Sequence, residues 1–114
     1  MRRDFGPHVH WDEFDEQMNV FRFKIGLLPQ FITIRIWQNE FGEWDFSRSH
    51  AIKTPKQDFC YWELRSCDTR EDALSHAVTG ISQYFRYAIE AGCKPHRDWL
   101  QPAFMVIEGK KVTD

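Results

Sequence analysis

The stretch that decides the fold is residues 69–92, TREDALSHAVTGISQYFRYAIEAG. Apolar side chains recur in it at steps of three and four, which is the spacing of one helix face. These positions are Leu74, Val78, Ile81, Phe85, Ala88 and Gly92, flanked by Ala77, Tyr84 and Ala91. The stripe is so wide that the helix must pack along a hydrophobic partner surface.

Both ends of this helix are marked in the sequence. Asp68 or Thr69 can serve as the N-cap, with Glu71 or Asp72 as the reciprocal acid of a capping box. Gly92 predicts the C-terminus, because glycine readily adopts the left-handed conformation that ends many helices.

The rest of the chain alternates between apolar and polar residues, which is the pattern of half-buried strands. The predicted strands are residues 19–27, residues 31–37, a strand that opens at Trp44 and Phe46 and continues or bends through His50 to Ile52, residues 59–65, and a short final strand at 104–107. We therefore predict a single α+β domain over residues 1–114. It has a mainly antiparallel sheet of four to five strands, with one long helix packed on one face. Residues 1–17 carry a charged run and predict a loosely ordered N-terminal arm.

Composition disfavours several classes of protein. The formal net charge of −2 comes from 15 basic and 17 acidic residues spread along the chain, which argues against a nucleic-acid partner. No run approaches the length of a membrane span, and the first residues lack the apolar core of a signal peptide. Cys60, Cys67 and Cys93 cannot all pair within one chain, so we expect a reduced, cytoplasmic protein.

Motifs for cofactor binding or catalysis are absent from the sequence. The 6 glycines stand singly and form no phosphate-binding loop, so we expect no cofactor. His8 and His10 have a spacing that can ligate a metal, but a solvated terminal pair is the simpler interpretation, and we expect no metal site. The alternative is a small enzyme built from His50, His76 or His96 with a carboxylate or a cysteine in a cleft.

The aromatic content of 16% is high for one small core, and rings left at the surface mark interfaces or ligand grooves. We expect a non-enzymatic binding module that self-associates as a dimer and recognises a protein or small ligand through an aromatic-rich surface or groove. The candidate rings are Trp37, Trp44, Phe46, Tyr61 and Trp62, with Arg35 and Arg48 as orienting charges.

A second alternative is single-stranded nucleic-acid binding on the polar face of the sheet. Arg22, Lys24, Arg35 and Arg48 would lie there near Phe31 and Trp37, and basic side chains beside exposed rings can stack bases. Arginine and lysine stems that simply lie over aromatic rings are the plainer interpretation, which the balanced charge favours.

Three runs resemble small uncharacterised cargo proteins of mobile elements, of the integron gene cassette, plasmid or phage type. The runs are Thr69-Arg70-Glu71-Asp72-Ala73-Leu74, Gly92-Cys93-Lys94-Pro95 and Trp99-Leu100-Gln101-Pro102. The resemblance covers the helix start and the segment after the helix. It implies a compact α+β accessory protein, often oligomeric, and supplies no site residues.

Overall fold

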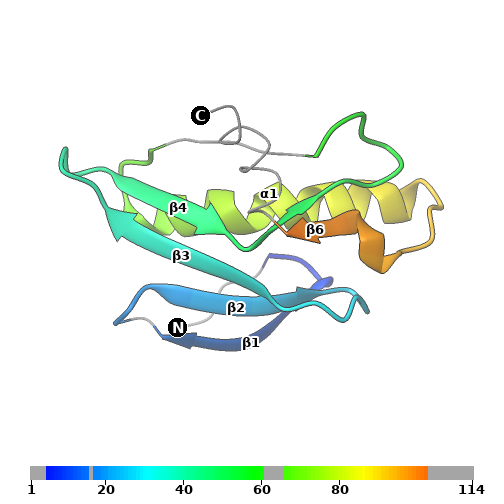
Figure 1. Ribbon diagram of the computed structural model, residues 1–114, viewed down its shortest axis with the longest axis horizontal. Helices are drawn as coiled ribbons and strands as arrows, with labels where there is room; N and C mark the ends of the chain where they lie inside the picture. The colour runs from blue at the N-terminus through cyan, green and yellow to red at the C-terminus, as the bar shows by residue number, and fades with distance from the viewer. Residues whose placement is uncertain (1–4, 16, 61–65, 103–114) are drawn as a thin grey trace.

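The computed structural model describes residues 5–15, 17–60 and 66–102 (Figure 1). It is an α+β domain with a four-stranded antiparallel sheet in the order β1-β2-β3-β4 and a two-stranded sheet of β5 and β6. The elements are β1 (Val9–Asp15), β2 (Val20–Ile25), β3 (Ile32–Gln38), β4 (Trp44–Arg48), β5 (His50–Ile52), α1 (Arg70–Glu90), the 3-10 helix η1 (Arg97–Trp99) and β6 (Leu100–Pro102). Among the described residues, no helix combines the length and apolar character needed to cross a bilayer.

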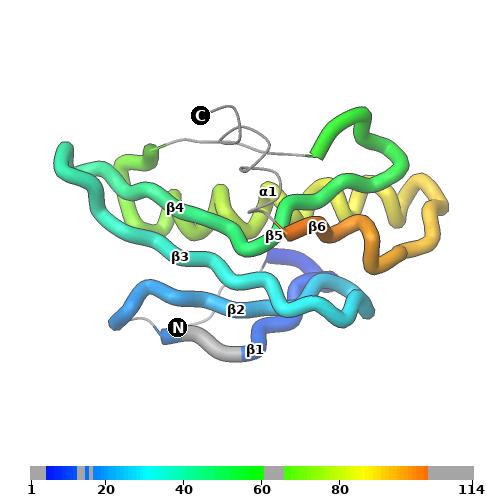
Figure 2. The backbone as a smooth tube through the Cα atoms, in the orientation of Figure 1, coloured from blue at the N-terminus to red at the C-terminus, as the bar shows by residue number. Residues whose placement is uncertain are grey.

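The predicted architecture is confirmed: β2 lies inside the predicted range 19–27, and β3 overlaps the predicted range 31–37 but continues to Gln38. The chain bends at Ser49, so β5 leaves the main sheet and pairs antiparallel with β6 (Figure 2). Most of the predicted strand 59–65 and all of 104–107 lie outside the described residues. The last described strand is β6, which the sequence pattern did not identify because it is only 3 residues long.

Residues 9–15 correct the prediction of a loose N-terminal arm, because they form strand β1 paired with β2. The pairing shifts register between Trp11 and Glu13, where a bulge interrupts the ladder. Before the bulge, Val9 and Trp11 pair with Ile25 and Phe23, two residues apart on each strand. After the bulge the register has shifted by one residue, so Phe14 pairs with Phe21. The alternation expected of a strand is broken, and the charged residues around the bulge made the segment resemble a solvated arm.

One face of the main sheet, the inner face, is buried against α1. Its fully covered residues are Phe21, Phe23, Ile25, Ile32, Ile34, Ile36 and Phe46, and the helix contributes Ala73, Leu74, Ala77, Val78, Ile81, Phe85 and Ala88. The helix contacts β3, β4 and β5. Thr69 is the N-cap, and its hydroxyl accepts the Asp72 N–H at 3.0 Å. Gly92, with φ +88, ends the helix as predicted.

The helix does not cover the whole inner face, and the N-terminal segment lies beside it. Phe5 packs edge-on against Trp11, with ring centroids 5.9 Å apart, and Trp11 packs against Phe23 at 5.5 Å. The Gly26 N–H donates to the His8 carbonyl at 2.7 Å, which ties the start of β1 to the end of β2. The layer under the sheet is therefore α1 together with residues 5–8.

The side chain of Phe85 on α1 lies against three other parts of the chain: the turn after β2, the N-terminal segment and the segment after the helix. Its side chain is 1% exposed, and its ring lies edge-on to His8 at 5.1 Å and to Trp99 at 5.7 Å. Gly26 has φ +55, and a Cβ there would lie 2.5 Å from Cζ of Phe85. Glycine is therefore required at Gly26 both for the backbone conformation and for the space taken by the ring.

Gly26→Ala should lower the free energy of unfolding by about 2–4 kcal/mol, because it adds backbone strain and overpacks the Phe85 ring. The measurement is urea denaturation. Gly42→Ala is the matched control. Gly42 has φ +83, but the nearest atom to its added Cβ is Nε2 of Gln38 at 3.9 Å, so this variant should lose only the stability that backbone strain removes. Adding Phe85→Leu to Gly26→Ala should cost less than the sum of the two single changes. Equal losses for the two glycine variants would contradict this account.

Candidate functional site

The face of the main sheet opposite α1, which we call the outer face, carries polar and aromatic side chains. Its central residues alternate with the buried ones on β2, β3 and β4: Arg22, Lys24, Thr33, Arg35, Trp37, Asp45 and Ser47, together with Phe31 just before β3. Trp37 is 45% exposed and Phe31 is 43% exposed. The outer face thus presents two large rings along the strand that lies between β2 and β4.

Phe31 is already contacted by cations of the protein itself. Nζ of Lys24 lies 4.6 Å from its ring centroid, and the guanidinium carbon of Arg22 lies at 5.1 Å. Arg22 also forms an ion pair with Asp12, with 3.1 Å between Nε and Oδ2. These side chains lie over the ring as ordinary surface residues do, and they occupy positions at which a stacked base would bind.

Arg35 and Trp37 are the predicted site residues that lie together on the outer face. Arg35 is exposed and sits between Val20 and Ser47 in the cross-strand register. Trp37 pairs with Asp45 on β4. A ring flanked by a cation and a carboxylate offers both stacking and charged contacts to a partner.

Three other predicted site residues face inward, because alternate residues of β4 share one side. Phe46 is 6% exposed within the core, and Trp44 is half-buried and packs against the core. Arg48 donates from Nε to the Ala77 carbonyl at 2.7 Å and from Nη2 to the His76 carbonyl at 3.0 Å. The expectation that Phe46 is an exposed ring is wrong, and Arg48 fastens the sheet to the helix. Tyr61 and Trp62 lie outside the described residues.

The histidines of the alternative enzyme hypothesis have separate surroundings in the described structure. His50 Nδ1 lies 2.8 Å from Ser49 Oγ, and Ser49 Oγ accepts the Thr33 N–H at 2.8 Å. His96 caps η1 by accepting the Asp98 N–H at 3.0 Å. Within the described residues, no group of three or more His, Cys, Asp or Glu side chains is placed to hold a metal ion.

Cys60 is poorly suited to act as a nucleophile. Its Sγ donates to Oε1 of Gln101 at 3.2 Å. Burial raises the pKa of the Cys60 thiol, and this outweighs the opposing effect of Lys53. The reactive thiolate is therefore disfavoured at neutral pH.

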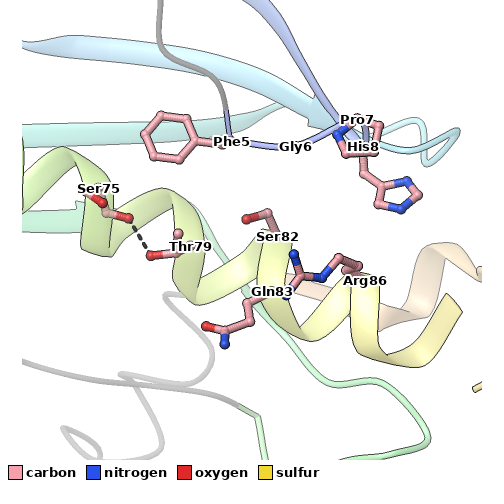
Figure 3. Close-up of a pocket in the computed structure, with 9 residues that line it drawn as sticks. All are labelled: Phe5, Gly6, Pro7, His8, Ser75, Thr79, Ser82, Gln83 and Arg86. Atoms are coloured by element: carbon pink, nitrogen blue, oxygen red, sulfur yellow. Dashed lines mark hydrogen bonds between the residues drawn. The ribbon is translucent and has the colours of Figure 1, made fainter. Parts of the chain in front are cut away.

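A second candidate site is a pocket between the N-terminal segment and α1, which we call the N-terminal slot. Its lining residues are Phe5, Gly6, Pro7, His8, Ser75, Thr79, Ser82, Gln83 and Arg86 (Figure 3). Sequence reasoning missed it. The helix residues do recur on one flank of α1, but such a flank resembles an ordinary solvated surface until the partner segment is placed.

Comparison with protein-family models, with curated proteins and with solved structures finds no match to this chain. Its function therefore has to be argued from the outer face and the N-terminal slot themselves.

Arg48→Gln should lower the free energy of unfolding by about 1.5–3 kcal/mol, because it removes charge-assisted hydrogen bonds to two helix carbonyls. Arg35→Gln is the matched control and should change stability by about 0.5 kcal/mol or less, since Arg35 is exposed on the outer face. Chemical denaturation of both variants checks this. Similar losses of stability in the two variants would show that the Arg48 hydrogen bonds do not hold the sheet to the helix.

His50 should make the protein less stable in acid. Burial lowers the pKa of the His50 imidazole from its ordinary value of 6.5, so the unfolded chain takes up this proton first as the pH falls. The contribution of neutral His50 is complete above pH 6.5 and is lost below it, as the pH falls towards the lowered folded-state pKa. His50→Gln should therefore lose less stability than the parent between neutral pH and about pH 5. Parallel stability curves for the two proteins would contradict this assignment.

Proposed function

We propose that this protein is a non-enzymatic binding module that self-associates through the outer face of its main sheet. The observation that carries the proposal is the placement of Trp37 and Phe31, both more than two-fifths exposed, at opposite ends of one strand on that face. Apolar rings set among charged side chains are typical of interface centres.

The outer face is complementary to itself. Trp37 and Phe31 stand three residues on either side of Ile34, so a two-fold axis across β3 at Ile34 would lay each Trp37 on the second copy's Phe31. Because a two-fold axis relates the two copies, the contact between Trp37 and Phe31 would form twice. Each tryptophan would also meet the Lys24 and Arg22 cations that surround Phe31, which is a favourable cation–π arrangement.

Charge on the outer face also suits a second copy better than a polyanion. Arg22, Lys24 and Arg35 are accompanied by Asp12 and Asp45 on the flanking strands. A surface with charges of both signs can pair with a second copy of itself, whereas its carboxylates would repel the phosphates of a nucleic acid.

The size of this face predicts a modest affinity. Four strands about 4.8 Å apart and about 20 Å long cover roughly 400 Å², which is below the ~800 Å² per partner of a typical stable complex. We therefore expect a dimer that forms at high protein concentration and dissociates on dilution.

Trp37→Glu should weaken the dimer about tenfold or more, because it removes a ring and places a charge within the interface. Sedimentation equilibrium over a range of protein concentrations measures the dissociation constant. Tyr87→Glu is the control: Tyr87 is also 45% exposed but lies on α1, and this change should leave association intact.

A monomer at every concentration would contradict self-association. A dimer lost in Tyr87→Glu but kept in Trp37→Glu would place the interface on the helix instead.

A further inference from the structure

The N-terminal slot has the dimensions of a small-molecule site. Its volume is about 520 Å³, within the range of about 300–1,000 Å³ that is usual for ligand pockets. Its helix wall runs from Ser75 to Arg86, which at the rise of an α-helix is about 16 Å. The opposite wall is the short segment Phe5 to His8 (Figure 3). A slot of this shape suits an elongated ligand.

Ser82 supplies a hydroxyl group that faces into the slot. The residue is 7% exposed, and its side chain points from the helix towards the N-terminal segment (Figure 3). Helical serines and threonines commonly donate to the carbonyl four residues earlier, as Thr79 does to Ser75. The Ser82 hydroxyl has no such bond and no other hydrogen-bond partner among the described residues. Water can reach this hydroxyl in the open slot, and a ligand oxygen bound there would replace that water.

The charge of the slot favours an anion. Arg86 and His8 are among its lining residues, and none of them carries a carboxylate. Arg86 makes only surface contacts: its Nε lies 3.9 Å from Glu90 Oε2, with both side chains at least half exposed, and its guanidinium carbon lies 5.5 Å from the Tyr87 ring centroid. Such a surface pair is weak, so the guanidinium can exchange it for a bidentate contact with a ligand carboxylate.

At the end away from Arg86, the Phe5 ring supplies the apolar part of the lining and lies beside two small hydroxyl residues, Ser75 and Thr79. Figure 3 shows Phe5 beside Ser75 and Thr79, while His8 lies towards the Arg86 end. An aromatic ring at one end and a guanidinium at the other match a ligand with an apolar body and a single anionic head.

We propose that the N-terminal slot binds a small amphiphilic carboxylate, with its apolar body against Phe5 and its head between Arg86, Ser82 and His8. The site lies on the helix side of the sheet, so it is separate from the association surface on the outer face. The ligand class follows from the cation, the unpaired hydroxyl and the ring, all on the walls of one slot.

The test is titration of the full-length protein with benzoate, 3-phenylpropionate and octanoate, followed by amide NMR shifts. We expect saturable binding of at least one of them, with the largest shifts in residues 5–8 and 75–86. The uncharged 3-phenylpropionamide should bind about tenfold more weakly than its acid, because it cannot form the charge-assisted pair with Arg86.

Two variants assign the contacts. Arg86→Gln should weaken carboxylate binding about tenfold, and Ser82→Ala should weaken it severalfold while the spectrum stays that of the folded protein. Glu90→Gln is the matched control, since it removes the competing partner of Arg86 and should leave affinity unchanged or improve it. Absence of binding by all three carboxylates at about 10 mM would overturn the proposal, as would binding that Arg86→Gln leaves unchanged or that shifts only residues outside the slot.

Discussion

The structure depends on the space that Gly26 leaves for the ring of Phe85. A side chain at Gly26 would collide with this ring at 2.5 Å, and only a residue that tolerates φ +55 can make the turn after β2. The same ring contacts His8 and Trp99, which belong to segments at opposite ends of the described chain. One helical side chain therefore joins the N-terminal segment, the β2–β3 turn and the segment after the helix. Its packing fixes where α1 lies under the sheet.

This placement of the helix determines which surfaces remain for function. The inner face is taken up by α1 and by residues 5–8, and Arg48 fastens β4 to the helix backbone through two carbonyls. Alternation along β3 then directs Arg35 and Trp37 to the opposite side, where the described residues leave them exposed. The gap between the two components of the inner layer forms the N-terminal slot. Both proposed binding surfaces thus follow from how the core is closed.

Local patterns in the sequence were sufficient for the main elements. The stripe from Leu74 to Ala88 and the cap at Thr69 predicted α1, and the isoleucines of β3 predicted its buried side. The aromatic site was predicted less well, because Phe46 and Arg48 have the same parity as Trp44 and face the helix. Strand alternation says which residues share a face. It does not say which of the two faces the helix will cover.

Features that depend on tertiary contacts were beyond the sequence pattern. The bulge between Trp11 and Glu13 hid β1, and the three-residue strand β6 is defined only by its pairing with β5. The N-terminal slot could not be predicted because it forms only when residues 5–8 pack beside α1, some seventy positions later in the chain. The need for glycine at Gly26 likewise depends on a ring that belongs to a distant element.

The central claim is that the exposed side of β3 is where copies of this protein meet. Its most direct test is to compare amide NMR spectra of the protein from roughly 20 µM to roughly 1 mM, a range that spans the affinity expected of a small interface. The account predicts concentration-dependent shifts centred on residues 31–37 and on the neighbouring positions of β2 and β4, while α1 stays constant. Shifts confined to the helix, or spectra that do not change with concentration, would contradict it.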